Sequence, residues 1–301
     1  MKILVTGGTV FISRYTAEYF AAKGHEVYVL NRNTRPQSKG VKLIECDRND
    51  IGGKLKNIHF DAVIDVTAYT AEDINNLLDG LESFDNYVMI STSAVYPETL
   101  EQPYKESDGL GENRYWGAYG SNKIAAEKAL LKRVPNASII RPCYVYGEYN
   151  NLYRESFVFD CAEQDKPFYV PNDGKMPLQF FHVEDLCRLI EIILIKRPAK
   201  KIFNVGNEPV TITEWVEACY RAVGKAPELI YVNNGAVQHK YFPFLDYGYV
   251  LDVTAQNELL PDLIPLDEGL RRSYEWYKLN RELVKKRNFF DYIENNIKEV
   301  K

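Results

Sequence analysis

Tyr119 and Lys123 lie four residues apart in the stretch "YGSNK", which continues with the helical pattern "IAAEKALLK". Residues four apart share one face of a helix, so a phenol and an ammonium group would point into the same site. A phenol with a pKa of about 10 is a poor base at neutral pH, but a neighbouring cation favours the phenolate. Tyr119 is therefore a candidate general base for an alcohol whose carbon loses a hydride. With 22 tyrosines in the chain, this spacing also arises by chance and needs support from its surroundings.

A hydroxyl that could orient such an alcohol ends the apolar run "NYVMISTS", residues 86–93. Thr92 can both donate and accept hydrogen bonds there. We predict a catalytic group made of Thr92, Tyr119 and Lys123.

The opening stretch "KILVTGGTVFIS", residues 2–13, is typical of a buried strand, a glycine turn and a helix that together bind a dinucleotide. The later two glycines of that pattern are replaced by Val10 and Ser13, so the stretch taken alone fits an ordinary strand-to-helix turn equally well. The helix N-terminus would still direct free N–H groups at a phosphate. The residues that we expect around the cofactor here are Gly7, Thr9, Val10, Phe11 and Ile12.

The end of the second strand, "LNRNTR", bears on the choice of cofactor. A carboxylate at this place binds the ribose 2′-hydroxyl of NAD, whereas arginine accommodates the 2′-phosphate of NADP. The chain has Asn31 in place of the acid, followed by Arg32 and Arg35, which favours NADP over NAD. The alternative is that both arginines are simply solvated.

These residues must be positioned by a sheet. Apolar runs at 26–32, 41–47, 61–68, 86–93 and 137–147 alternate with helix-length segments, which predicts a Rossmann-type, doubly wound parallel sheet with ligands at the carboxyl ends of its strands. Regularity fades after Gly147. We therefore predict an NAD(P)-binding domain over 1–147, joined by elements near 180–206, and a smaller, irregular substrate region over 148–301.

The composition counts against several classes of function. A net charge of −5 gives no basic footprint for nucleic acid, and the apolar run at 189–195 is too short to span a membrane. Five widely spaced cysteines without a CxxC pair indicate reduced thiols, and we assign no metal ligands. Because a core strand follows Lys2 directly, we expect no signal peptide and a cytoplasmic protein.

The motifs "TGGTVFIS", "STSAVY", "YGSNK", "RPCYVYG", "FFHVEDL" and "FNVGN" occur in the order found in the extended short-chain dehydrogenase/reductase superfamily. The chain resembles its NAD-dependent epimerase/dehydratase family over nearly its whole length. By position, Thr92, Tyr119 and Lys123 match the family's catalytic hydroxyl, base and lysine. The resemblance also implies a homodimer, and cofactor contacts from Asp47 with Arg48 beside it, from Ala68 and from Pro142.

The chain departs from this family where sugar nucleotides are held. The family's RPxNVYG motif has Tyr144 in place of its Asn, Leu178 replaces a diphosphate-binding Arg, and "HKYFPF" around residue 242 offers little basic contact. A diphosphate favours arginine partners, so these losses argue against a sugar-nucleotide diphosphate.

The predicted function is that of an NAD(P)-dependent epimerase/dehydratase-type oxidoreductase. Its small-molecule substrate would be a sugar or nucleotide-sugar-like alcohol. The same motifs also resemble a divergent branch related to chloroplast stem-loop RNA-binding proteins. The alternative is therefore a cofactor-retaining binding protein, for RNA or for regulation, without turnover.

Overall fold

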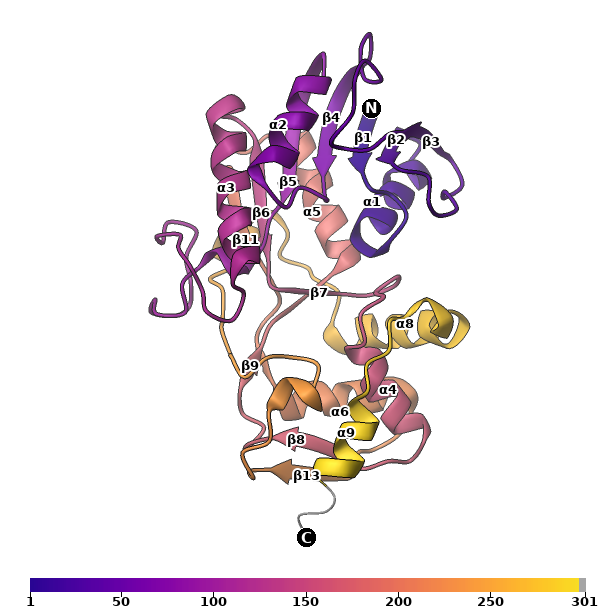
Figure 1. Cartoon of the computed structure of the whole chain (residues 1–301), viewed down its shortest axis with the longest axis vertical. Coiled ribbons are helices and arrows are strands. Elements are labelled where there is room, and N and C mark those ends of the chain that lie inside the picture. The colour runs from indigo at the N-terminus through magenta and orange to yellow at the C-terminus, as the bar shows by residue number, and fades with distance from the viewer. Residues whose placement is uncertain (298–301) are drawn as a thin grey trace.

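The computed structural model describes residues 1–297, and a seven-stranded sheet occupies its upper part (Figure 1). All neighbouring strands pair in parallel, in the order β11-β6-β5-β4-β1-β2-β3. The strands are β1 (Lys2–Thr6), β2 (Glu26–Asn31), β3 (Val41–Glu45), β4 (His59–Asp65), β5 (Ser83–Ile90), β6 (Ser138–Pro142) and β11 (Ile202–Val205). The chain crosses from β3 at one edge to β4 beside β1, so the strand order reverses between β1 and β4. Ligands of doubly wound sheets bind at such a point.

Helices cover both faces of the sheet. On one face α1 (Phe11–Ala22) packs against α5 (Val183–Lys196), and on the other α2 (Ala71–Gly80) packs against α3 (Ala118–Arg133). Alternate residues of β1 serve the two faces: Ile3 and Val5 join one buried apolar cluster, and Leu4 joins the other. Strands buried on both faces explain why the sequence shows continuous apolar runs. The predicted fold class is confirmed.

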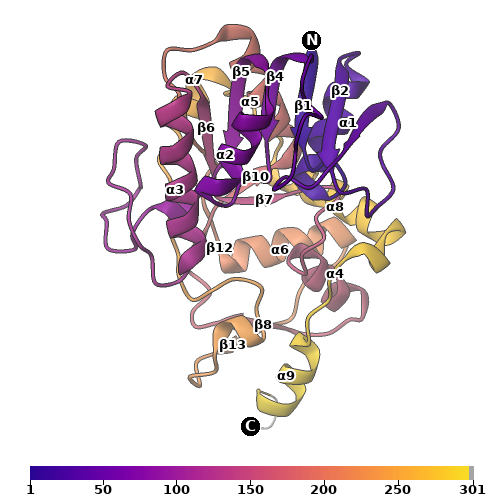
Figure 2. The same ribbon diagram turned by 45° about the horizontal axis from the view of Figure 1, so that its top comes forward.

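Smaller elements lie below the carboxyl ends of the sheet, as the tilted view shows (Figure 2). Three two-stranded ladders join β7 (Tyr144–Tyr146) to β10 (Phe180–His182), β8 (Phe168–Pro171) to β13 (Leu229–Val232), and β9 (Pro177–Leu178) to β12 (Val210–Thr211). The helices of this part are α4 (Glu155–Glu163), α6 (Ile212–Val223), α7 (Thr254–Leu259), α8 (Leu266–Leu279) and α9 (Phe289–Asn296). Short 3-10 turns span Ser93–Val95, Gln238–Lys240 and Arg281–Leu283.

The apolar run 137–147 forms two strands rather than one. β6 stays in the main sheet beside β11, whereas β7 leaves it and pairs with β10 in the lower part. The break falls at Cys143, directly after Pro142, whose ring has no N–H to continue a ladder. The single run thus carries the chain from the sheet into the lower part.

Two further expectations concern the whole chain. None of the helices within residues 1–297 has the length and apolar character needed to cross a membrane. The five cysteines are buried and unpaired in this structure.

The domain division at residue 147 stays a prediction, and the last four residues of its second part lie outside the described residues.

Candidate active site

A cleft of about 440 Å³ opens at the carboxyl ends of β1, β4, β5 and β6. Its lining includes residues 10–13 after β1, 66–67 after β4, 90–93 at the end of β5, and 142–145 after β6. The lower part of the molecule contributes the opposite wall through Asn151, Leu152, Arg154 and Tyr249. The cleft therefore lies at the reversal of strand order, where a nucleotide is expected.

The glycine turn after β1 has the geometry of a phosphate-binding loop. Gly7 and Gly8 have φ values of +90° and +91°, and a Cβ on Gly8 would lie 2.4 Å from a methyl group of Val29. Phe11 also has a positive φ of 39°, a strained conformation that often marks functional sites. α1 begins there without a side-chain cap among the described residues, so its first N–H groups are available to an anion.

The two missing glycines are replaced without blocking the turn. Val10 is extended, with a φ of −137°, a conformation that any residue adopts. Ser13 is buried under the loop, and its Oγ donates a hydrogen bond of 2.9 Å to the Val10 carbonyl. Because a Cβ on Gly7 would lie 2.8 Å from that Oγ, the first glycine stays necessary. The loop fits a cofactor diphosphate despite its unusual sequence.

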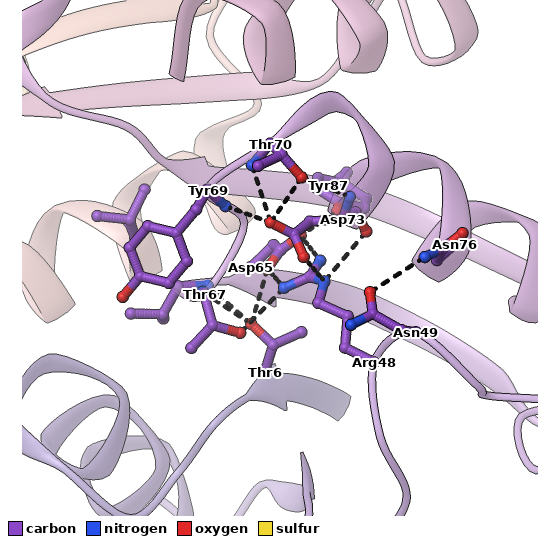
Figure 3. A network of polar contacts seen from close by, with 12 residues as sticks. Thr6, Arg48, Asn49, Asp65, Thr67, Tyr69, Thr70, Asp73, Asn76 and Tyr87 are labelled. Atoms are coloured by element: carbon purple, nitrogen blue, oxygen red, sulfur yellow. Dashed lines mark hydrogen bonds and ion pairs between the residues drawn. The ribbon is translucent and has the colours of Figure 1, made fainter. Parts of the chain in front are cut away.

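A buried carboxylate fixes the loop that follows β4 (Figure 3). Asp65 accepts hydrogen bonds from Thr6 at 2.7 Å and from Tyr87 at 2.6 Å, and its Oδ2 lies 2.5 Å from Nη2 of Arg48. Arg48 also donates to the Thr67 hydroxyl at 2.9 Å. Burial would raise the pKa of Asp65, but the charge of Arg48 and these hydrogen bonds hold it below its ordinary value. Since Thr67 lines the cleft, the network shapes the cleft wall.

Arg48 consequently has a different environment from the one that the sequence suggested. Its guanidinium group is turned inward onto Asp65 and does not line the cleft. The resemblance to the family placed it beside Asp47 at the cofactor, and that assignment stays a prediction. The carboxylate that binds it lies on another strand, which spacing along the chain does not indicate.

Tyr119 and Thr92 are brought together by a close contact of α3. A Cβ on Gly120 would lie 2.4 Å from the carbonyl oxygen of Ala94, so only glycine lets the helix pack this closely on the 3-10 turn after Thr92. Thr92, Tyr119 and Lys123 all line the cleft. Gly120 is a positioning residue that sequence reasoning missed, although it stands inside the "YGSNK" motif.

The pKa of Tyr119 is raised in this structure, which differs from the expectation that Lys123 lowers it. Desolvation in the cleft raises it most, although the side chain is 41% exposed, while a hydrogen bond with Thr92 and the charge of Arg154 lower it only in part. Lys123 is itself buried, which lowers its pKa to about 8, and its Nζ donates to the Ile90 carbonyl at 2.9 Å. The ammonium group is thus held against the strand end.

A second ion pair supports these residues from behind. Arg141 on β6 donates to Glu127 on α3, with Nη2–Oε2 at 2.6 Å, and to the Tyr96 hydroxyl at 2.8 Å. Ser91, at the end of β5, also donates to Glu127. This buried network joins α3 to the two strands whose ends carry Thr92 and Pro142. Sequence reasoning missed it because its members are far apart in the chain.

The second-strand residues lie outside the cleft lining. The Asn31 amide donates to the Gly7 carbonyl at 2.7 Å and to Gln37 at 3.0 Å, so it braces the phosphate loop. Arg32 and Arg35 are exposed, and their guanidinium groups make no hydrogen bond or ion pair with residues 1–297.

The structure brings seven of the predicted site residues to the cleft wall: Val10, Phe11, Ile12, Thr92, Tyr119, Lys123 and Pro142. The remaining ones flank it without lining it: Gly7, Thr9, Asn31, Arg32, Arg35, Asp47, Arg48 and Ala68. Ala68 is buried between Thr67 and Tyr69, which both line the cleft, and Asp47 is exposed after β3.

The opposite wall consists largely of residues that the sequence did not indicate. It includes Trp116, Asn151, Leu152, Arg154 and Tyr249, beside Tyr144, which was noted only as a departure from the family motif. Another departure, Leu178, is 1% exposed in the core, and Phe242 is fully buried. These two positions therefore present no charge to a ligand.

The motif histidine, His182, has a structural place. Its Nδ1 accepts a hydrogen bond of 3.2 Å from the Glu184 N–H and caps α5. Its Nε2 faces Glu148 at 3.4 Å, and Glu148 is also paired with Arg272 of α8 at 2.8 Å. This cluster ties the lower part of the molecule to the sheet.

Comparison with known proteins places this cleft in context. The profile of the "NAD dependent epimerase/dehydratase family" matches residues 3–89 and 75–206, more than half of the chain. A chloroplast stem-loop binding protein of 41 kDa from Arabidopsis thaliana is 29% identical, over 91% of this chain and 78% of its own length.

Solved structures share the fold. A dTDP-glucose 4,6-dehydratase from Bacillus anthracis in complex with NAD has a TM-score of 0.73 at 19% identity, covering 94% of this chain and 98% of that one. A UDP-glucose 4-epimerase from Thermotoga maritima with UDP-glucose has a TM-score of 0.72 at 18% identity, covering 93% and 100%. With its profile match, its parallel sheet and its glycine loop, the chain belongs to the NAD-dependent epimerase/dehydratase family of the extended short-chain dehydrogenase/reductase superfamily.

Proposed function

We propose that this protein oxidises or reduces an alcohol carbon of a sugar-like substrate in the cleft, with Tyr119 as the proton-transfer group. The observation that carries the proposal is the convergence of Thr92, Tyr119 and Lys123 on the cleft that the phosphate loop also lines. A bound nicotinamide cofactor would accept or supply the hydride. Its diphosphate would lie on the N–H groups of α1, and Pro142 would border its ring.

In the oxidation direction, Tyr119 takes the hydroxyl proton of the substrate while the C–H bond breaks and its electron pair leaves as hydride. The carbon–oxygen bond becomes a carbonyl, and the proton stays on the tyrosine oxygen. Thr92 holds the substrate oxygen by a hydrogen bond. Because burial raises the pKa of Tyr119, the phenolate needs a cation, and Lys123 on the same helix face and Arg154 across the cleft are candidates.

The test is Tyr119→Phe in the full-length chain, assayed by nicotinamide absorbance with NAD and NADP against a panel of sugars, sugar phosphates and UDP-sugars. We expect hydride transfer to fall by about 100- to 10,000-fold, because general base catalysis contributes that much. The dissociation constant of the cofactor should stay nearly unchanged.

Tyr115→Phe is the matched control, since Tyr115 stacks on Tyr247 with ring centroids 4.4 Å apart and does not line the cleft. It should keep wild-type activity. An unimpaired Tyr119→Phe enzyme would refute the mechanism.

For the cofactor, we propose a preference for NADP. The guanidinium groups of Arg32 and Arg35 are exposed at the end of β2, and no carboxylate stands at position 31 to repel a 2′-phosphate. The charge-assisted hydrogen bonds that such a phosphate would gain are among the strong ones in proteins.

A second candidate function is RNA binding without turnover, and the similarity to the chloroplast stem-loop binding protein favours it. The net charge of −5 counts against it, since RNA affinity depends largely on neutralising phosphates. Salt-dependent binding of a stem-loop RNA, together with no redox change across the substrate panel, would establish this alternative.

We also propose a homodimer, by resemblance to the family alone. α2 and α3 lie side by side on one face of the sheet and are the helices that would pair. Sedimentation that shows a monomer at working concentrations would refute it.

A further inference from the structure

Arg154 is one of two cationic side chains that line the cleft, with Lys123, and neither forms an ion pair within residues 1–297. Arg154 is the N-cap residue of α4. Its guanidinium carbon lies 5.1 Å from the ring centroid of Tyr144 and 5.6 Å from that of Phe244. Within residues 1–297 it forms no side-chain hydrogen bond and no ion pair, whereas Arg48 and Arg141 each hold a buried carboxylate.

The acid next to Arg154 in the chain does not serve as its partner. Glu155 is 4% exposed, and its carboxyl group accepts a hydrogen bond of 2.9 Å from the Asn150 amide instead. Burial raises the pKa of Glu155, and its hydrogen bonds and the charge of Arg154 lower it only in part. The positive charge of Arg154 therefore remains directed at the cleft.

A second polar group beside Arg154 also lacks a partner. The Tyr144 side chain is 6% exposed, and its hydroxyl finds no hydrogen-bond partner of normal geometry among residues 1–297, although the Tyr249 ring lies 5.8 Å away. A buried hydroxyl without a partner costs free energy that a ligand can recover. Tyr144 lines the same cleft, so its hydroxyl and Arg154 border one space.

The stacked geometry suits an anion. A guanidinium group that rests on aromatic faces keeps its N–H edge free for the two oxygens of a carboxylate or phosphate. Arg154 also lies near enough to the predicted base for its charge to act on the Tyr119 phenol. A ligand held at Arg154 is thus a small molecule that reaches Tyr119.

We infer that Arg154 and Tyr144 bind a single anionic group, a phosphate or a carboxylate, carried by the sugar-like substrate. This inference rests on the proposed function and narrows its substrate to a sugar monophosphate or a sugar acid. One unpaired arginine serves one such group, while Leu178 and Phe242 add no charge for a nucleotide diphosphate.

The test uses the full-length chain saturated with NADP and isothermal titration calorimetry with four probes: glucose, glucose 6-phosphate, glucuronate and UDP-glucose. We expect glucose 6-phosphate or glucuronate to bind about 10- to 100-fold more tightly than glucose, the range for one charge-assisted interaction. The tighter of the two identifies phosphate or carboxylate as the source of the charge.

Arg154→Gln should abolish this advantage and leave glucose binding unchanged, and Arg154→Lys should retain part of it. The matched control is Arg287→Gln, since Arg287 also lies over a phenylalanine ring, at 4.7 Å, but outside the cleft. It should bind all four probes as the wild type does.

Three results would overturn the inference: an Arg154→Gln variant with wild-type affinity for glucose 6-phosphate and glucuronate, an equal loss of affinity for glucose, or tightest binding of UDP-glucose. Absence of any preference for the anionic probes in the wild type would overturn it as well. Tyr119→Phe should keep the Arg154-dependent binding. Binding without hydride transfer in the wild type would refute the proposed function but not this anion site.

Discussion

The two walls of the cleft differ in how their polar groups are satisfied. On the sheet side, Asp65 is paired with Arg48 and Glu127 with Arg141, and both carboxylates accept further hydrogen bonds. On the lower side, Arg154 and the Tyr144 hydroxyl have no such partners within residues 1–297. The polar groups of the sheet side are thus paired within the protein, whereas Arg154 and Tyr144 on the lower side can still form hydrogen bonds with a ligand. Under the proposed function, the paired sheet side would hold the cofactor and the unpaired groups of the lower side would contact the substrate.

The largest effect is expected from Asp65→Ala, which breaks the sheet side. Removing one partner of a buried ion pair leaves Arg48 with only the longer ion pair to Asp73, at 3.7 Å, and should lower the free energy of unfolding by about 3–5 kcal/mol. Urea unfolding measures the loss. Asp85→Ala, at an exposed aspartate whose ion-pair partner is His59, is the control and should change stability by less than about 0.5 kcal/mol. Equal effects of the two substitutions would show that the sheet side is not held by its ion pair.

Low pH should destabilise the fold, because carboxylates whose pKa is lowered in the folded protein must take up protons. The charge of Arg48 holds the pKa of Asp65 below its ordinary value despite burial. The His182 ring, 3.4 Å away, and the charge of Arg272 lower the pKa of Glu148 to about 2 although burial opposes them. In the unfolded chain these groups titrate at about 3.9 and 4.3, so the unfolded chain binds protons first as the pH falls. Stability is therefore full above about pH 5 and decreases toward pH 2. Urea unfolding between pH 7 and pH 3 should show this fall, with a shallower slope for Asp65→Ala; a flat profile would contradict it.

Arg32→Ala tests whether the exposed arginines at the end of β2, on the sheet side of the cleft, bind the cofactor. We expect NADP to bind about 10- to 100-fold more tightly than NAD, because a charge-assisted hydrogen bond contributes about 1.5–3 kcal/mol. The substitution should narrow that gap by weakening NADP, as calorimetry with both cofactors would measure. Lys39→Ala, also exposed, is the control. Equal wild-type affinities, or an equal loss for both cofactors, would refute the 2′-phosphate contact.

The smallest effects are expected from replacing one tyrosine by phenylalanine on each wall. Tyr87→Phe removes a hydrogen bond of 2.6 Å to the Asp65 carboxylate and should cost about 1.5–3 kcal/mol of stability. Tyr144→Phe removes a buried hydroxyl that has no partner of normal geometry among residues 1–297, and it should stabilise the protein by about 1 kcal/mol while weakening substrate binding. The two changes delete the same atom, so urea unfolding compares them directly. If both substitutions changed the free energy of unfolding in the same direction, the two walls would not differ in how their polar groups are satisfied.

Local patterns in the sequence were enough to predict much of the fold. Apolar runs marked the strands of the parallel sheet, because strands buried on both faces carry continuous hydrophobic residues. The strand–glycine–helix opening indicated the loop, and the four-residue spacing placed Tyr119 and Lys123 on one helix face. These features depend on neighbours in the chain, so the sequence alone determined them.

Other features were decided by contacts between distant segments. Arg48 follows β3, as a cofactor residue would, yet Asp65 on β4 draws it away from the cleft. Burial raises the pKa of Tyr119, although its spacing from Lys123 predicted a lower one. Arg154 carries no motif, and only the packing of α4 against the cleft makes it a candidate ligand-binding residue. Burial and long-range partners set the charge state and direction of a side chain, and neither can be read from spacing along the chain.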